Sequence, residues 1–480
     1  MRSFNRQLEF RSRTRIFIPT AITLSLLLLL SGCDPHGPSI EMLRAGGELR
    51  VALVSAPHTY YLDPGGTLGF DYDLLRAFCK KHELKLDVTI VKNRLQAKDL
   101  LIKRKVHLAA GLIPVSASHH PRLRFGPSYS MIQAQVIYIR DSQRPSSVND
   151  LIGVNLETLA GSQGDIELSR LVKANRSLRW QTSNAATADQ LLERLDTREI
   201  DFAVVPSTDF KVLRLKYPRL EIGFSLGPTQ ATAWVLQRDA HFSVDRALVD
   251  FFVDSENGGL RQRLWDRYFG HYDKFDFVDA RSFLRSYRDR FPTLREYFLD
   301  ASTTSGIDWR LLAALSYQES HWRPEARSPT GVRGLMMLTT RTANRLQVSR
   351  LDPAQAVTGG ARYLEDLFQR LPRSIMGNER LWFALAAYNL GMGHVEDARV
   401  LTQTRGGNPS HWDEVRRYLP LLAKPTVAAT TRYGKARGAE AVKFVTNIRR
   451  YFDTMRQLEQ RFSSPKNPNQ VFKVRTPSVL

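Results

Sequence analysis

The spacing of apolar residues changes once along this chain, near Pro292, and that change divides the sequence into two modules of different fold class. Before Pro292, short apolar segments of strand length alternate with amphipathic segments of helical spacing. Strands that alternate with helices indicate βα units around a parallel sheet. After Pro292 only helical spacing remains, interrupted by Gly and Pro, which predicts an all-α domain able to bury its own core. A chain of 480 residues is expected to hold two or three such domains.

The first module, residues 48–270, is predicted to be a two-lobed α/β domain in which the chain crosses between the lobes twice. The expected strands are Leu49–Val54, Leu84–Val91, His107–Ile113, Gln135–Ile139, Gly153–Leu156, Asp201–Val205 and Ala231–Leu236. The expected helices are Asp71–His82, Ala97–Lys105, Asp165–Ala174, Ala188–Leu195, Val244–Phe252 and Leu260–Tyr268. Residues 34–47 contain two Pro and are expected to form a short tether before this module.

The second module, residues 292–462, is predicted to be entirely helical. Its expected helices are Leu294–Ala301, Trp309–Ser320, Thr340–Leu346, Asp352–Leu371, Glu379–Leu390, His394–Arg405, Trp412–Leu422 and Ala439–Phe462. Residues 271–291 are aromatic and charged without being rich in Gly or Ser, so we expect a linker that packs between the modules. Residues 463–480 hold three Pro and few apolar residues, which predicts a disordered tail.

The N-terminus has the composition of an export signal. Five Arg precede the apolar run Ile16–Leu30, which Pro19 interrupts and which ends in small residues before Cys33. A basic segment, a short apolar core and small residues are typical of a secretory signal peptide, here residues 1–33. Leu30–Cys33 also resembles a bacterial lipobox, which implies cleavage before Cys33 and lipidation of its thiol; ordinary signal cleavage is the alternative. Cys79, the other cysteine, is then expected to be a small buried apolar residue.

The chain carries a formal net charge of +21, which favours polyanionic partners. Export excludes nucleic acid and leaves anionic lipid and the carboxylate-rich cell wall. The His residues are scattered and no Cys lies near them, so the sequence predicts neither a metal site nor a cofactor.

One stretch, Gly306–Trp322, has the pattern of an active-site helix. Asp308 is expected to cap it, and Glu319 falls on the same side of the helix as Leu312 and Leu315. Burial disfavours the charged form of a carboxyl group, so the pKa of Glu319 is expected to rise toward the range of a general acid. The alternative is a Glu at the helix edge that reaches solvent or Arg323.

The first module resembles the periplasmic amino-acid-binding family of solute receptors. The resemblance rests on the segments Gly47–Ala52 (GELRVA), Gly69–Leu74 (GFDYDL), Gly126–Tyr129 (GPSY) and Glu199–Val204 (EIDFAV). It implies the two-lobed fold. Family members usually hold the ligand carboxylate with an Arg, whose place His119 takes here, and the ligand amine with an acid, whose place Pro206 takes. We therefore expect a wall peptide, or no small ligand, in place of a free amino acid.

The second module resembles the soluble-lytic-transglycosylase family, which implies a goose-type-lysozyme-like fold. The motifs are Gln318–Trp322 (QESHW), Ser328–Thr339 (SPTGVRGLMMLT), Ala386–Gly391 (AAYNLG) and Tyr433 ahead of Tyr451. Together with the receptor-like module, residues 48–462 resemble the F-type branch of the membrane-bound members. The resemblance implies a peptidoglycan lyase with Glu319 as catalytic residue and Ser320, Met336, Met337, Tyr388, Asn389 and Tyr433 at the substrate.

Each of these substrate residues has a structural alternative. Ser320 is expected to bind the N-acetyl group or to orient Glu319, or else to be a polar residue at the helix end. The two Met offer contact with a sugar face, or belong to the core, and Met337 stands where the wider family often has Gln. Tyr388 and Asn389 are expected to bind an acetamido group, with helix capping as the alternative, and Tyr433 to orient the Glu319 carboxyl, with ordinary packing as the alternative. Gly331 and Gly334 are expected to allow a tight loop close to the sugar.

A glycosidase usually needs two carboxylates, and no motif surrounds Glu325, Asp352, Glu365 or Asp366. A single acid suffices if the substrate assists, which favours a lyase that forms 1,6-anhydromuramoyl ends. The alternatives are a muramidase-type hydrolase with a second carboxylate, and a receptor whose helical domain only binds glycan. The expected partners are peptidoglycan strands, a membrane and a muropeptide ligand of the first module. The expected location is the periplasmic face of the outer membrane, with the inner membrane as the alternative because Asp34 follows Cys33.

Overall fold

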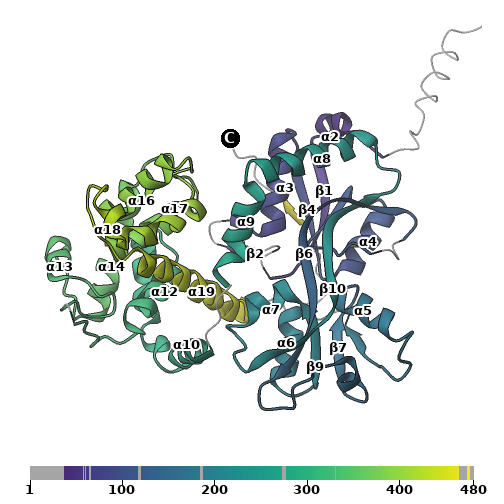
Figure 1. The fold of residues 1–480 in the computed structure, drawn as a ribbon, viewed down its shortest axis with the longest axis horizontal. Coiled ribbons are helices and arrows are strands. Elements are labelled where there is room, and N and C mark those ends of the chain that lie inside the picture. The colour runs from purple at the N-terminus through teal and green to yellow at the C-terminus, as the bar shows by residue number, and fades with distance from the viewer. Residues whose placement is uncertain are drawn as a thin grey trace, which may run out of the picture.

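The structure is a computed structural model that describes residues 37–463 and 473–475, except 58, 60, 64–65, 117–119, 184–186, 273–276, 330 and 378. The predicted signal peptide, Cys33, Asp34 and His119 lie outside these residues. Two bodies lie side by side, a two-lobed α/β module and a helical domain (Figure 1). Within the described part of the chain, no helix combines the length and the hydropathy needed to cross a bilayer. The predicted multi-domain fold class, α/β followed by all-α, is confirmed.

One mixed sheet runs through both lobes of the first module, in the order β11-β4-β1-β5-β10-β6-β9-β7-β8, where β11 is Lys473–Arg475 from the C-terminal end of the chain. In the first lobe, β1 pairs in parallel with β4 and β5; in the second, β7 pairs in parallel with β8 and β9. The strands are β1 (Glu48–Val54), β4 (Lys85–Val91), β5 (Leu108–Ala110), β6 (Leu123–Ile139), β7 (Leu156–Leu159), β8 (Gln181–Ser183), β9 (Phe202–Pro206) and β10 (Leu220–Gln237), with a separate hairpin of β2 (Tyr61–Asp63) and β3 (Gly66–Leu68).

The two crossings are the long antiparallel strands β6 and β10, which extend through both lobes (Figure 1). Only the ends of these strands, Gln135–Ile139 and Ala231–Leu236, were expected from the sequence. Gly126 and Pro127 in β6 and Gly227 and Pro228 in β10 interrupt the apolar pattern. The ladder continues through these interruptions with register shifts, one of them between Leu226 and Gln230.

Helices cover the sheet in both lobes (Figure 1). They are α3 (Phe70–Lys81), α4 (Arg94–Ile102), α8 (Phe242–Asn257) and α9 (Leu260–Tyr268) in the first lobe, and α5 (Gln163–Leu171), α6 (Ala188–Asp196) and α7 (Ser207–Leu213) in the second. Cys79 is buried in α3, as expected.

The predicted tether is wrong for Ile40–Gly46, which form helix α2. Ser39 caps this helix, and the Ile40 N–H donates to Ser243 Oγ of α8 at 2.9 Å. Ile40 and Leu43 are buried against the first lobe, and this burial holds the segment in place.

The helical domain is built around α12 (Trp309–Ser320), which packs against α11 (Arg295–Ser305), α14 (Pro353–Arg370) and α19 (Gly438–Ser463). Its other helices are α13 (Thr340–Leu346), α15 (Glu379–Leu390), α16 (Met392–Thr404), α17 (Trp412–Tyr418) and α18 (Pro425–Ala428). The predicted linker contains α10 (Phe277–Asp289), whose Ala280 and Phe283 are fully buried in the core of this domain. Most of the predicted linker is therefore part of the helical domain.

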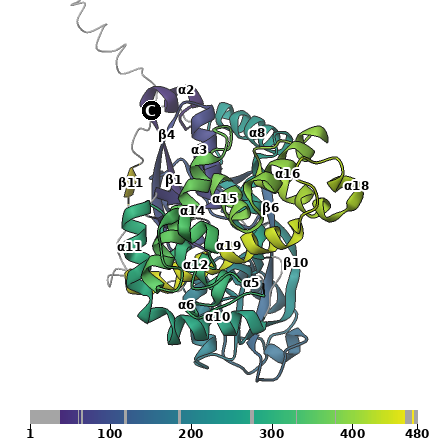
Figure 2. The ribbon, with the colours of Figure 1, turned by 90° about the vertical axis from the view of Figure 1, so that its left-hand side faces the viewer.

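The predicted disordered tail is wrong at three residues. Lys473–Arg475 form β11, which pairs antiparallel with β4 at the edge of the sheet (Figure 2). Residues 464–472 and 476–480 lie outside the described part, so the expectation of disorder there is untested.

Candidate active site

Helix α12 places Glu319 one residue before the helix ends. Asp308 caps the helix as expected, because its Oδ1 accepts a hydrogen bond from the Arg310 N–H at 2.8 Å. The end comes earlier than Pro324, since His321 and Trp322 both adopt left-handed backbone conformations, with φ of 53° and 55°. The buried Trp322 indole N–H donates to the Ala313 carbonyl at 2.8 Å, and this contact holds the unusual turn in place.

The surroundings of Glu319 favour its neutral form. Burial raises the pKa of this carboxyl to about 8, and burial is the only cause of that shift. Within the described residues, no hydrogen bond or ion pair to the carboxylate is found. The direction of this pKa shift agrees with the expectation. Of the alternative, a Glu at the helix edge that reaches solvent or Arg323, no contact with Arg323 is found among the described residues, while the side chain stays partly exposed.

The loop Ser328–Leu338 lies against the end of α12, where two serines hold it. The Leu335 carbonyl accepts hydrogen bonds from Ser316 Oγ at 3.1 Å and from Ser320 Oγ at 2.9 Å. Ser320 is 3% exposed and also donates to the Ser316 carbonyl. Its hydroxyl is therefore bound to main-chain oxygens of the helix and the loop, and the predicted contact with the N-acetyl group is not supported.

Glycine is required at one position of this loop for two reasons. Gly334 has φ of +84°, and a Cβ added there would lie 1.9 Å from the Arg350 carbonyl oxygen. Gly331 has a similar φ of +83° but open space where a Cβ would stand. Arg350 closes the loop by donating to the Gly331 and Leu338 carbonyls, each at 3.1 Å.

The two methionines of the loop differ in position. Met336 is fully buried and packs so closely on Gly360 of α14 that a Cβ there would meet its Cε at 2.5 Å. The predicted sugar contact of Met336 is therefore wrong, because no part of its side chain reaches the surface. Met337 is partly exposed with φ of +46°, so it remains a candidate for contact with a sugar.

Tyr388 of α15 binds the loop and lies near enough to Glu319 to be influenced by its charge. Its hydroxyl donates to the Met336 carbonyl at 2.9 Å, and its ring lies 5.1 Å from that of Tyr363. Burial, together with the charges of Glu319 and Tyr363, holds the pKa of Tyr388 well above its usual range. Tyr388 and Glu319 therefore belong to one site. Asn389 follows Tyr388 on the helix and is exposed, so its amide is open to a ligand.

Tyr433 is placed by contacts other than those expected. It is 52% exposed, covers Gly393 at the start of α16, and its backbone N–H donates to Asp397 Oδ2 at 2.9 Å. Among the described residues, Tyr433 makes no hydrogen bond to Glu319. The geometry therefore supports the alternative, in which Tyr433 packs against its neighbours. Tyr451, the other tyrosine of this motif, is buried and donates to Asp279.

None of the four carboxylates considered as a second catalytic group is shown to act together with Glu319, because each has another partner or lies elsewhere. Asp352 caps α14 by accepting from the Gln355 N–H at 2.8 Å, and Asp366 pairs with Arg345 and Arg370. Glu325 is exposed, and Glu365 lines a cavity at the junction with the first module. None of them contributes to the pKa of Glu319.

Sequence reasoning missed the charged groups in the interior of the first module. Arg94, at the start of α4, is fully buried beside Asp209 of the other lobe, and the charge of Asp209 is the largest influence that opposes the burial of Arg94. Asp71 is also fully buried and accepts from the Tyr129 hydroxyl at 2.5 Å. Pro206 removes one acid, but Asp209 supplies another three residues later.

Among the described residues, no cluster of three or more His, Cys, Asp or Glu is arranged to hold a metal.

Comparison with known proteins agrees with this geometry. Residues 296–410 match the family described as Transglycosylase SLT domain. A membrane-bound lytic murein transglycosylase F from Aeromonas hydrophila is 40% identical over 441 residues, which are 91% of this chain and 88% of the relative. The protein of the same name from Stutzerimonas stutzeri is 38% identical over 94% of this chain and 93% of its own.

The structure of a mutant ArgBP from T. maritima, 19% identical, covers 48% of this chain and 99% of its own, with a TM-score of 0.43. The relatives that match almost end to end, together with Glu319 at the end of α12, assign the chain: it belongs to the membrane-bound lytic murein transglycosylase F family.

Proposed function

We propose that this protein cleaves the β-1,4 bond between N-acetylmuramic acid and N-acetylglucosamine of peptidoglycan without water, leaving 1,6-anhydromuramoyl ends. The observation that carries this proposal is a single carboxyl group, Glu319, whose pKa is raised to about 8 by burial alone. A protonated carboxyl at neutral pH is the form that a general acid needs. The four other carboxylates have different positions or partners. Asp352 caps a helix, Asp366 is paired with arginines, Glu325 is exposed, and Glu365 lines another cavity.

The reaction needs two proton transfers at the same carboxyl. Glu319 gives its proton to the glycosidic oxygen as the bond to C1 breaks, and the N-acetyl oxygen of the substrate stabilises the developing positive charge. The resulting carboxylate then takes the proton of the muramoyl O6 hydroxyl while O6 bonds to C1. The attacking oxygen belongs to the same sugar, so no water has to be captured and ordered.

Mass spectrometry of the products separates this lyase from the hydrolase alternative. Purified sacculi digested with the protein should release anhydromuropeptides, each lighter by one water than the product of a muramidase. Products that carry the added water would assign the hydrolase, and intact sacculi would leave only glycan binding.

In this proposal four residues around Glu319 position it or contact the substrate. Tyr388 orients the loop through the Met336 carbonyl and lies in the field of the Glu319 carboxyl. The exposed Asn389 offers an amide to an acetamido group, and Met337 offers an apolar edge to a sugar ring. Ser320 acts as a positioning residue through the Leu335 carbonyl.

The first module acts in this proposal as a receptor for a wall peptide that regulates the lyase. Its support is the buried pair of opposite charges, Arg94 and Asp209, one from each lobe. Isothermal titration with a wall tetrapeptide and with free amino acids tests the assignment: the peptide should bind and change the rate of sacculus digestion. Binding of free amino acids alone, without a change in rate, would argue against it.

A lipid on Cys33 is proposed to hold the protein at the periplasmic face of the outer membrane. The lipobox-like Leu30–Cys33 supports the lipid anchor, and Asp34 directly after Cys33 makes the inner membrane the alternative location. Mass spectrometry of the N-terminal peptide tests the lipid, and separation of inner and outer membranes tests the location. An unmodified thiol on Cys33 would exclude the anchor.

A further inference from the structure

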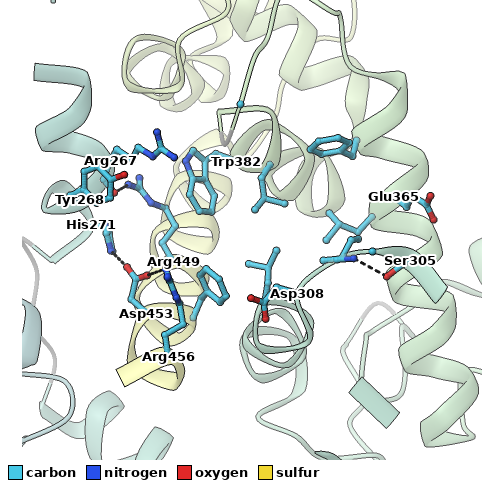
Figure 3. Close-up of a pocket in the computed structure, with 18 of the residues that line it drawn as sticks. Arg267, Tyr268, His271, Ser305, Asp308, Glu365, Trp382, Arg449, Asp453 and Arg456 are labelled. Carbon is cyan, nitrogen blue, oxygen red and sulfur yellow. Dashed lines mark hydrogen bonds and ion pairs between the residues drawn. The ribbon is translucent and has the colours of Figure 1, made fainter. Parts of the chain in front are cut away.

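A cavity of about 330 Å³ lies at the junction of the two modules, away from Glu319. The end of the first module supplies Arg267, Tyr268 and His271, and the helical domain supplies the rest of the wall (Figure 3). Helix α12 contributes only its first turn, at Asp308 and Leu311, whereas Glu319 lies at the other end of that helix. This cavity is therefore separate from the candidate active site.

The size and position of the cavity are those of a ligand site. Small-molecule sites occupy roughly 300–1,000 Å³ and occur preferentially between domains. Much of the wall is apolar, from α12, α14, α15 and α19. These side chains are Leu311, Leu364, Phe368, Leu381, Trp382 and Phe452.

Three arginines line the cavity, each stacked on an aromatic ring. The guanidinium carbon of Arg449 lies 4.8 Å from the Trp382 ring centroid. Arg456 is stacked in the same way on Phe452, at 5.3 Å, and Arg267 on Tyr268, also at 5.3 Å. A guanidinium carries its N–H groups in a planar fork, in the geometry that matches a carboxylate.

The charges on the walls are unequally distributed. Figure 3 shows Arg267, Arg449 and Arg456 on one side of the cavity and Glu365 on the opposite side. The arginines are themselves paired with acids: Arg267 binds Asp73 at 3.2 Å, and Arg449 and Arg456 lie 3.8 Å from Asp266 and Asp453. Asp266 also pairs with Arg416, and Asp453 with His271 at 2.7 Å. Four guanidinium groups therefore share three carboxylates at this wall, which leaves an excess of positive charge. Asp308 is bound by Arg310 at 2.5 Å. A ligand that enters with one end charged meets the guanidinium edges at one wall and apolar side chains along the rest.

We propose that this cavity binds a small carboxylate with an apolar body, the carboxylate at the three arginines and the body against Leu381, Phe368 and Leu364. A ligand bound there contacts both modules at once, so it stabilises their docked arrangement by binding only when they are joined. This site does not depend on the proposed lyase chemistry or on the proposed ligand of the first module.

Two probes that differ only in charge test the proposal. N-acetyl-L-phenylalanine has a carboxylate and an apolar body, and its carboxamide has the same body without the charge. Calorimetric titration of the full chain in detergent should show the acid binding roughly tenfold or more tighter than the amide, as expected for charge-assisted hydrogen bonds. Equal affinities, or no binding of the acid, would overturn the proposal.

Three variants and one control locate the binding site. Leu381→Trp fills the cavity and should abolish binding, whereas Val249→Trp, on the exposed face of α8, should not change it. Arg267→Gln should weaken binding of the acid probe and leave binding of the amide probe unchanged. Misfolding would not produce such a selective loss. Glu365→Gln removes a negative charge that repels the carboxylate of the probe, so the affinity for the acid probe should rise by a few-fold. Weaker acid binding by Glu365→Gln, or unchanged binding by Leu381→Trp, would contradict the site.

Discussion

The Glu319 side chain is only partly exposed, and no cation contributes to the pKa of its carboxyl group. Its pKa is therefore raised to about 8, and it keeps its proton at neutral pH. Glu319→Gln should lower the rate of anhydromuropeptide release by roughly a hundredfold or more, the usual contribution of general acid–base catalysis.

The dependence of the rate on pH follows from the same group. Wild-type activity should fall as pH rises through about 8, because the acid loses its proton there. Glu325→Gln, which changes an exposed carboxylate six residues later in sequence, is the matched control and should keep full activity. Loss of activity in that control would indicate a second catalytic carboxylate and hence the hydrolase.

Glu319 should also make stability depend on pH. Its pKa is about 8 in the folded protein and near its ordinary value of 4.5 in the unfolded chain, so between these pH values the folded state binds more protons. The free energy of unfolding should therefore decrease as pH rises from about 4.5 to 8, and the loss should be complete above 8. The expected size is on the order of a few kcal/mol.

Glu319→Gln removes this dependence, because an amide does not titrate. The variant should therefore gain stability relative to wild type at pH 9 and show little gain at pH 4. Calorimetric melting at the two values measures the difference. An equal shift at both pH values would mean that Glu319 is not buried as a neutral acid.

At the scale of elements, the loop Ser328–Leu338 is the part of the site most dependent on exact backbone geometry. Gly334→Ala introduces a Cβ 1.9 Å from the Arg350 carbonyl in a left-handed conformation, so it should displace the loop and reduce activity severely. Gly331→Ala is the matched control, with nearly the same φ and open space around it. It should cost about 1 kcal/mol from backbone strain alone. Similar effects of the two substitutions on activity and melting temperature would contradict the role of the close approach.

Element by element, the sequence predicted most accurately where apolar periodicity and capping agree. The bounds of α9, α12, α13 and α15 match those expected, and Asp308 caps α12. The strands β6 and β10 were largely missed, because Gly and Pro interrupt their pattern while pairing between the strands maintains the ladder. The local order of apolar and polar residues does not tell which strands pair with each other.

For the candidate site, the sequence predicted Glu319 with its raised pKa, and it assigned Tyr388 to the same substrate site. It could not distinguish the buried Met336 from the partly exposed Met337, since the difference arises from Gly360 on a helix distant in sequence. The buried Arg94 and Asp209 were missed for the same reason, because their proximity depends on how the two lobes close.

At the scale of the whole molecule, buried ionic contacts join the two modules. Asp266, at the end of α9, pairs with Arg416 of α17 and lies 3.8 Å from Arg449 of α19. His271 Nε2 lies 2.7 Å from Asp453 Oδ2, and both residues are largely buried. Contacts of this kind couple the unfolding of one module to that of the other.

Asp266→Asn should weaken that coupling, because it leaves the buried Arg449 with less compensation for its charge. Removing one partner of a buried ion pair costs roughly 3–5 kcal/mol. Scanning calorimetry of wild type should show one cooperative transition, and the variant should show the two modules melting separately. Asp99→Asn, which removes an exposed pair with Lys103, is the control and should change the profile little. A single, unshifted transition in Asp266→Asn would mean that the modules are joined by other contacts, and the cavity between them would then lack the rigid walls that its ligand requires.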